Sequence, residues 1–155
     1  MSERDAKPFS PWQERMIDFG VKPLSAITRW LYRMSAGRVG GRWSYGTPVM
    51  LMTTKGRKSG EPRTVPLLYL CDGDDLIIVA SKAGTSRNPQ WFKNLEAEPR
   101  VEVEIGADKK AMTAGFTSDE EKAALWPRLV EMYPDFGDYQ ARTKRNIPVI
   151  RLTLN

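Results

Sequence analysis

Short apolar runs separated by turn-forming residues constrain the fold of this 155-residue chain more than any other feature. About six runs have the length of strands, and they cover residues 48–53, 63–70, 76–81, 100–105, 110–116 and 148–154. Residues 76–80 are continuously apolar, which predicts a strand buried on both faces, whereas residues 100–105 alternate and predict one solvated face. Tight connections such as Asp-Gly-Asp-Asp at 72–75 join antiparallel neighbours, so the runs predict an antiparallel sheet.

Helical signals surround these strands. Ser118 and Glu121 form a capping box ahead of one helix, and a second helical segment is expected over 135–145. Asn88 can cap a helix in the middle of the chain, with Pro89 at its first helical position. Hairpin-linked strands flanked by helices predict an α+β, mainly β fold, in which helices pack around a closed or split antiparallel barrel.

The N-terminal part of the chain carries two patterns. Residues 1–20 begin polar and contain two prolines, which predicts a flexible arm with a short helix over 12–19; residues 21–155 then form a single domain. An apolar stripe at helical spacing follows, formed by Leu24, Ile27, Trp30, Leu31 and Met34. We expect this basic amphipathic helix to pack against the sheet or against a partner subunit in a homodimer; the alternative is peripheral contact with the inner face of the cell membrane.

The residue counts exclude several kinds of catalytic site. The chain has no histidine, so nucleophile pairs and metal sites that need an imidazole are ruled out. Its single cysteine, Cys71, rules out an internal disulfide and a metal site built from several thiolates. If the protein is an enzyme, we therefore expect an organic cofactor, and no metal, to supply the chemistry. No apolar run approaches the roughly 20 residues of a membrane span and no signal-peptide core is present, which predicts a cytoplasmic protein.

Positive charge is concentrated around one loop. Residues 19–60 contain eight cations and no acidic residue, whereas residues 61–155 contain 13 basic and 15 acidic side chains. The segment 53–63, Thr-Thr-Lys-Gly-Arg-Lys-Ser-Gly-Glu-Pro-Arg, connects two predicted strands and combines four cations with two glycines. Cations and free backbone N–H groups at one edge of a sheet are typical of an anion-binding loop, although a solvated basic turn has the same composition.

A basic surface can also bind nucleic acid. Proteins that bind single strands interleave aromatic side chains with the cations, because bases stack on aromatic rings. Residues 55–63 contain no aromatic residue. We therefore expect a small anionic ligand and no nucleic acid.

Several blocks of the sequence, taken in order, resemble one family: the deazaflavin-dependent nitroreductases of actinobacteria, which use coenzyme F420. The blocks are Thr-Thr at 53–54, Gly-Arg-Lys-Ser-Gly at 56–60, Pro-Arg at 62–63, Pro-Leu at 66–67, Ala-Ser-Lys at 80–82, Asn-Pro-Gln-Trp-Phe at 88–92, Asn-Leu at 94–95, Trp-Pro at 126–127, Tyr-Pro at 133–134, Asp-Tyr-Gln at 138–140 and Ile-Pro-Val at 147–149. The resemblance covers residues 27–154. It implies a split barrel like those that bind FMN, with hydride passing from reduced F420 to a small oxidised molecule.

The resemblance implies roles for residues of the basic loop and of two later segments. Arg57, Lys58 and Arg63 would hold the phosphodiester and the acidic tail of the cofactor, while Ser59 and Gly60 would offer backbone N–H groups. Ser81 and Lys82 would lie near the ring and the phosphate, and Pro89 and Trp91 would shape the wall of the site. The implied cofactor-binding set also includes Lys55, Pro66 and Ala80. For Trp91, burial in the core is the alternative interpretation.

Tyr133, Tyr139 and Ser81 are the implied catalytic residues. A phenol, whose ordinary pKa is about 10, can donate a hydrogen bond or a proton to a quinone, enone or nitro oxygen as hydride arrives. Packing within a helix is the alternative role for each tyrosine. Phe136 stands where a nitro-reducing member of the family has a third tyrosine, so one donor is missing and reduction of nitroimidazoles is in doubt.

The residues and the resemblance lead to one functional prediction with two alternatives. We expect an F420H2-dependent reductase that transfers hydride to a quinone, an enone or a nitro compound. One alternative is an FMN-dependent oxidase or reductase with the same barrel. The other is a protein without catalytic activity that binds the cofactor or nucleic acid.

Overall fold

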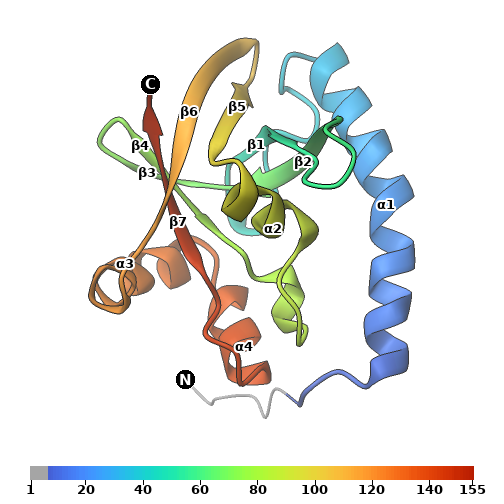
Figure 1. Ribbon diagram of the computed structural model, residues 1–155, viewed down its shortest axis with the longest axis vertical. Helices are drawn as coiled ribbons and strands as arrows, with labels where there is room; N and C mark the ends of the chain where they lie inside the picture. Colours follow the sequence, from blue (N-terminus) through green and yellow to red (C-terminus); the bar gives the residue numbers. More distant parts are fainter. Residues whose placement is uncertain (1–6) are drawn as a thin grey trace.

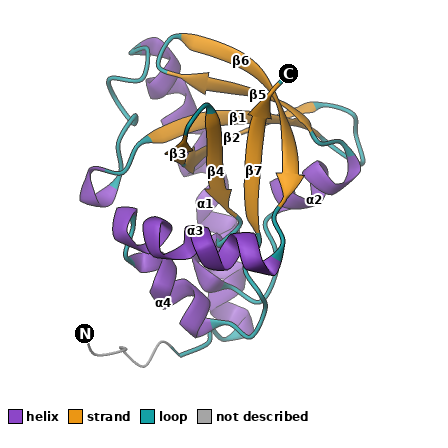
Figure 2. Ribbon diagram, turned by 90° about the vertical axis from the view of Figure 1, so that its left-hand side faces the viewer, coloured by secondary structure: helices purple, strands orange, loops and turns teal. Residues whose placement is uncertain are grey.

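The computed structural model describes residues 7–155, without the side chains of residues 19–25. Within these residues, seven antiparallel strands form one sheet of order β2-β1-β5-β6-β7-β4-β3 that curls into a split barrel (Figures 1 and 2). The strands are β1 (Val49–Lys55), β2 (Pro62–Leu68), β3 (Leu70–Asp72), β4 (Asp75–Val79), β5 (Arg100–Ile105), β6 (Asp108–Phe116) and β7 (Val149–Leu154). The predicted mainly β fold is confirmed. The additional strand arises because the predicted strand over 63–70 is divided into β2 and β3.

Helices cover one side and one end of this barrel. They are α1 (Pro11–Met34), α2 (Gln90–Ala97), α3 (Asp119–Met132) and α4 (Asp135–Arg142), with two short 3-10 helices, η1 (Ser44–Gly46) and η2 (Lys82–Gly84). α1 runs along one side of the sheet in Figure 1, and α3 and α4 lie across one end of β4 and β7 in Figure 2.

Two predicted helix caps differ in detail from the structure. Ser118 does cap α3, because its Oγ accepts from the Glu121 N–H at 3.1 Å, but the Glu121 carboxylate accepts from Arg151 Nε at 2.7 Å. Asn88 does not cap α2, which begins at Gln90 after Pro89. The side chain of Asn88 instead accepts a hydrogen bond from the distant Arg145, so a tertiary contact replaces the expected local one.

The core has two layers because β4 is buried on both faces, as predicted. Leu76 and Ile78 face the interior of the barrel, where they pack with side chains of β1, β5, β6 and β7. Ile77 and Val79 face the other way and pack with α3 and α4, including Leu129. Alternation along one strand thus joins the barrel to the two C-terminal helices.

α1 is one continuous helix, which differs from the predicted arm followed by two helical segments. Ser10 caps it in a capping box: its Oγ accepts from Gln13 N at 3.3 Å, and the Gln13 side chain accepts from Ser10 N at 2.8 Å. The helix therefore begins inside the segment 1–20 that was expected to be flexible, and it continues past residue 20 without a break. Residues 1–6 of the predicted arm lie outside the described residues.

The polar face of α1 contacts the barrel. Tyr32 is buried, and its hydroxyl donates to the Glu104 carbonyl at 3.2 Å and accepts from Gly106 N at 2.8 Å. Arg33 Nη2 lies 2.8 Å from the Glu104 carboxylate, which is itself buried. Arg29 Nη1 donates to the carbonyl of Thr64 in β2 at 2.9 Å. The helix is thus attached to the sheet mainly by hydrogen bonds and one ion pair.

The apolar stripe of α1 points away from the barrel. Ile27, Trp30 and Met34 are 58%, 62% and 72% exposed, and Trp12 and Met16 continue the exposed stripe toward the N-terminus. Of the two surfaces expected to cover this stripe, the sheet is therefore wrong for these residues, and the partner subunit stays a prediction. The side chain of Leu24 lies outside the described residues. The barrel surface under α1 presents a carboxylate and carbonyl groups, which pair with the polar face of the helix.

Candidate functional site

The basic loop forms a tight hairpin between β1 and β2. Gly56 N donates to Glu61 O and Gly60 N donates to Gly56 O, both at 2.8 Å, while Ser59 Oγ accepts from Glu61 N at 3.2 Å. Gly60 adopts a φ of 72°, in the left-handed region that glycine enters without steric cost. The Gly60 N–H that was expected to be offered to the cofactor is therefore used within the loop.

Arg57 is held by α2. Its backbone N and its Nη1 both donate to Asn94 Oδ1, at 3.2 and 3.0 Å, and its Nη2 donates to Gln90 Oε1 at 2.7 Å. Asn94 is buried and also donates to Thr54 Oγ1 at 3.2 Å. The donors of this guanidinium thus attach the basic loop to α2. The sequence alone did not assign this role to Asn94. The one hint in the sequence was an amide side chain among the apolar residues of α2.

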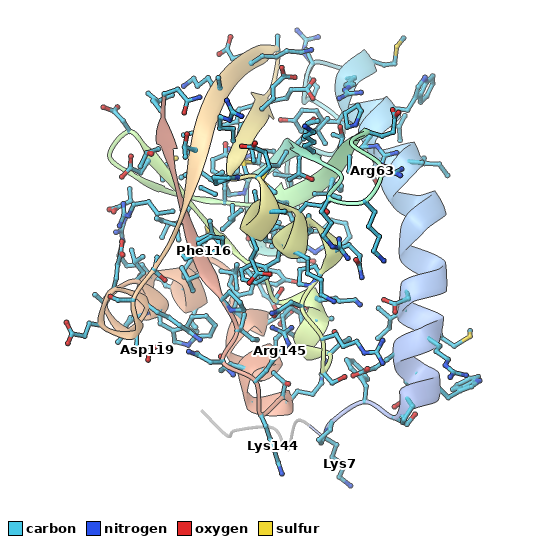
Figure 3. All side chains as sticks on the ribbon, in the orientation of Figure 1. Lys7, Arg63, Phe116, Asp119, Lys144 and Arg145 are labelled. Carbon is cyan, nitrogen blue, oxygen red and sulfur yellow. The ribbon has the colours of Figure 1, made fainter. Side chains whose placement is uncertain are left out.

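Three of the predicted cofactor cations remain exposed on this side of the barrel. Lys55 and Lys58 have no carboxylate within 4 Å in the part of the chain that the structure describes, and Arg63 contacts Ser59 Oγ at 3.5 Å. Figure 3 shows Arg63 on the side of the barrel that faces α1. An open groove of about 330 Å³ adjoins Lys55 and Gly60. The half-buried Pro66 follows on β2, opposite Leu51.

The segment after β4 contains a left-handed turn. Lys82, Ala83 and Gly84 have φ values of 42°, 53° and 74°. This conformation costs about 1–2 kcal/mol for each of the two residues that are not glycine, and such strain is typical of functional sites. A side chain at Gly84 would force the turn away from α4, because a Cβ atom there would lie 2.5 Å from the carbonyl oxygen of Tyr139.

Carboxylates of α1 are bound to this turn. Lys82 Nζ lies 2.7 Å from the Asp18 carboxylate. The Glu14 carboxylate accepts from Ser86 N at 2.7 Å and from Ser86 Oγ at 2.8 Å, and the bond from the backbone N–H lowers the pKa of Glu14. The donors of the 82–86 segment thus bind anionic groups in this structure, which fits the predicted role of Lys82.

Three predicted cofactor residues near this turn are buried. Ala80 is fully buried, and Pro89 and Trp91 are also buried. Trp91 belongs to the barrel core, with its ring 6.5 Å from that of Phe92. This burial corresponds to the alternative interpretation of Trp91, and it leaves Ser81 and Lys82 as the half-buried members of the predicted set in this segment.

The two predicted catalytic tyrosines lie side by side. Tyr133 ends α3 and Tyr139 lies in α4, and their hydroxyl oxygens are 3.2 Å apart. Burial, followed by the hydrogen bond with Tyr133, raises the pKa of Tyr139 above its ordinary value of 10.0, so this phenol keeps its proton at physiological pH. Phe136 is buried beside both rings and cannot present a polar group to the site.

Tyr45 is a neighbour of this pair that sequence reasoning missed. It lies in η1 with a φ of 61°, which is a left-handed outlier for an aromatic residue. Its hydroxyl donates to the Asp135 carboxylate at 3.1 Å, and its ring meets that of Tyr133 edge-on with centroids 5.6 Å apart. No local sequence pattern predicts this contact, because it joins segments about 90 residues apart in the chain.

A continuous series of contacts joins the basic loop to the tyrosines. Arg57 bonds to Gln90 at the start of α2, and Asn88, two residues earlier, accepts from Arg145 Nη1 at 2.9 Å. Arg145 Nη2 donates in turn to the Ser81 carbonyl at 2.6 Å. The turn that follows Ser81 packs directly against α4, which carries Tyr139. The structure therefore brings the cationic loop, the strained turn and the tyrosine pair into one connected region.

Residues 7–155 contain neither a metal-binding cluster nor a helix suited to span a membrane. No group of three or more cysteine, aspartate or glutamate residues there is arranged to hold a metal ion. Among the helices that the structure describes, none combines the length and the apolar character needed to cross a bilayer.

Comparisons with known proteins agree on one family. The family model of the F420H(2)-dependent quinone reductases matches residues 25–153. An F420H(2)-dependent quinone reductase of Mycobacterium tuberculosis (strain ATCC 25618 / H37Rv) is 40% identical over 147 residues, which are 93% of this chain and 97% of that protein. A solved F420-H2 dependent reductase is 38% identical, covers 68% of this chain and 94% of its own, and superposes with a TM-score of 0.64. A solved structure described as a domain-swapped dimer is 33% identical, covers 83% of this chain and 95% of its own, and has a TM-score of 0.66.

Proposed function

Because this chain belongs to the F420H(2)-dependent quinone reductase family, we propose that it reduces quinones to hydroquinones with coenzyme F420 as the electron donor. Two features support this assignment. The match to the family model spans 129 of the 155 residues, and hydride chemistry is supplied by a bound cofactor and not by amino-acid side chains. When bound, the reduced deazaflavin supplies the hydride.

The exposed cations and hydrogen-bond donors of this protein suit an anionic cofactor. Lys55, Lys58 and Arg63 leave positive charge exposed along one side of the barrel, where it attracts the acidic part of the ligand. The observation that carries the proposal is the 82–86 turn, where Lys82 and Ser86 N already hold the carboxylates of α1. We expect the anionic part of the cofactor to take over these donors.

The tyrosine pair suits a quinone acceptor. Reduction of a quinone by hydride leaves negative charge on an oxygen, which must then receive a proton. We assign Tyr139 as the donor of a hydrogen bond to that oxygen, because its raised pKa keeps the phenol protonated. Tyr133 would orient the Tyr139 hydroxyl through the 3.2 Å contact. Tyr45 would form the wall of the acceptor side next to Tyr133.

An assay of acceptor classes tests this function. The protein is incubated without oxygen with reduced F420 and, separately, with a quinone such as menadione, an enone and a nitroimidazole. We expect turnover of the quinone and weaker or no turnover of the nitroimidazole, since Phe136 presents no third hydroxyl. Absence of quinone turnover with reduced F420, or turnover with reduced FMN alone, would refute the assignment.

We also infer that the apolar stripe of α1 is covered by a second copy of the chain. The stripe lies opposite the polar face that contacts the barrel, and the relative described as a domain-swapped dimer covers most of this chain. Sedimentation should therefore detect a dimer, and replacing Trp30 and Met34 with serine should give a monomer. A monomeric wild type that sediments with anionic lipid vesicles would show that a membrane surface covers the stripe instead.

A further inference from the structure

Arg145 gathers one segment of the chain around a single guanidinium group. Its Nε donates to Thr85 O at 2.8 Å, its Nη1 to Ala80 O at 3.1 Å and to Asn88 Oδ1 at 2.9 Å, and its Nη2 to Ser81 O at 2.6 Å. All four acceptors belong to the segment 80–88. Figure 3 shows Arg145 between the ribbon of α4 and the turn that contains η2. A rigid fork of donors is well suited to fixing several carbonyl groups at once.

The segment that Arg145 holds is the strained one. Three consecutive residues, 82–84, are left-handed, and this conformation persists only where the surrounding structure over-determines it. Within the turn, Gly84 N donates to Ser81 O at 2.8 Å. From outside, Arg142 Nη1 donates to Ala83 O at 2.9 Å, so a second arginine of the same C-terminal region supports the centre of the turn. Arg142 and Arg145 therefore bond to carbonyl groups before, within and after the turn.

The same contacts set the position of the turn relative to the tyrosines. Gly84 lies so close to α4 that a Cβ atom would be 2.5 Å from Tyr139 O and 2.9 Å from Tyr139 Cα. Arg145 follows α4 by three residues, so its bonds to Ser81 and Thr85 connect the end of that helix to both ends of the turn. Any shift of the turn would change the separation between Ser81 and Tyr139.

Arg145 also places positive charge behind the turn. Its hydrogen-bond partners are all neutral oxygens, and in the described part of the chain no carboxylate lies within 4 Å of it. Burial lowers the pKa of the guanidinium, but an arginine in a protein stays protonated. A partly buried charge without an acidic partner favours an anion at the adjoining surface.

We propose that Arg145 is the positioning residue that holds the 81–88 segment in its cofactor-binding conformation and fixes its distance from Tyr139. This inference rests on the proposed function, in which that segment binds the anionic cofactor. Arg145 acts through the backbone of the segment and not by contact with the reacting atoms.

The test compares Arg145→Lys with Arg151→Lys. The first variant keeps the charge but loses the fork of donors. The second is a matched control, because Arg151 is also partly buried and multiply bonded, to Asp72, Asp75 and Glu121, none of which belongs to the segment 80–88. Three quantities are measured: hydrogen exchange of amides 82–86 in the protein without cofactor, the Kd for F420, and kcat with a quinone.

We expect Arg145→Lys to raise exchange of amides 82–86 by about tenfold or more relative to the barrel amides and to weaken F420 binding about tenfold, since several hydrogen bonds from a charged group are lost. Arg151→Lys should lower the melting temperature without either effect. Gly84→Ala, which displaces the turn from α4 and leaves Arg145 intact, should lower kcat more than it weakens F420 binding. If Arg145→Lys does not fold, Gly84→Ala still tests the spacing between the turn and Tyr139, and an unchanged kcat in this variant would overturn that part of the inference.

The outcomes separate this inference from the proposed function. Unchanged exchange and unchanged F420 affinity in Arg145→Lys, with a wild type that binds F420 normally, would overturn the role of Arg145 alone. A lowered melting temperature as the only effect would also overturn it. Failure of the wild type to bind F420 would refute the proposed function itself, whatever the exchange data show.

Discussion

Replacing Tyr139 with phenylalanine removes one oxygen atom and leaves the ring in place. In the folded protein, that oxygen lies 3.2 Å from Tyr133 Oη. Loss of this neutral hydrogen bond should lower the free energy of unfolding by only about 1 kcal/mol. A hydrogen bond that the same hydroxyl donates to an oxygen gaining negative charge is stronger, at about 1.5–3 kcal/mol. Because about 1.4 kcal/mol corresponds to a tenfold change in rate, kcat with a quinone should fall by about 10- to 100-fold.

Stopped-flow oxidation of reduced F420 by menadione measures this effect, and quenching of tryptophan fluorescence measures the Kd for F420. We expect the Kd of Tyr139→Phe to remain near that of the wild type, because the hydroxyl acts on the acceptor and not on the cofactor. Tyr69→Phe is the matched control, since Tyr69 is a buried tyrosine of the barrel core away from the site. A wild-type kcat in Tyr139→Phe would refute the assignment of this hydroxyl and leave Tyr139 a packing residue.

The remaining predictions concern the charges and the pH dependence of the site. The double variant Lys58→Ala with Arg63→Ala should weaken F420 binding by about 10-fold or more and make that binding less dependent on salt, because exposed cations are screened by ions. Isothermal titration at two salt concentrations measures both effects, and an unchanged Kd would show that the loop is an ordinary turn. Asp18→Asn should lower the Kd for F420 by about 2- to 10-fold, because it releases Lys82 from its 2.7 Å ion pair with Asp18. A higher Kd would count against Lys82 as a ligand of the cofactor. Since the pKa of Tyr139 is raised, the contribution of this residue to the free energy of unfolding is fully present below pH 10 and is lost as the pH rises beyond 10. We therefore expect no loss of kcat from ionisation of this phenol up to pH 10. A fall in kcat near pH 8 that is absent in Tyr139→Phe would contradict this.

Much of the fold follows from local patterns in the sequence. The continuous apolar run of β4 predicted burial on both faces, and Leu76 and Ile77 do enter different layers of the core. The pattern was less informative for α1, because periodicity identifies an apolar stripe but not the surface that it faces. Under α1 the barrel presents the Glu104 carboxylate and carbonyl oxygens, so Arg33 and Tyr32 contact it and the stripe stays outside.

In the candidate site, too, the sequence identifies residues but not the surfaces that they contact. The concentration of cations identified the basic loop, and resemblance to a family identified both tyrosines. The structure places Tyr133 and Tyr139 within hydrogen-bonding distance. The resemblance could not reveal that Arg57 is held by a buried amide of α2, because that bond joins residues 37 positions apart. The roles inferred for Arg145 and Tyr45 depend on contacts between segments more than 50 residues apart. Such contacts leave no periodic signal in a single sequence.

We propose that this barrel binds an anionic deazaflavin between its basic loop and the turn after β4. The most direct measurement is an equilibrium titration of the purified protein with F420 and, in parallel, with FMN, followed by quenching of its tryptophan fluorescence. We expect saturable binding of F420 at micromolar concentration, much weaker binding of FMN, and a loss of F420 affinity in the Lys58→Ala, Arg63→Ala variant. Equal affinity for both flavins, or no binding of F420, would contradict it.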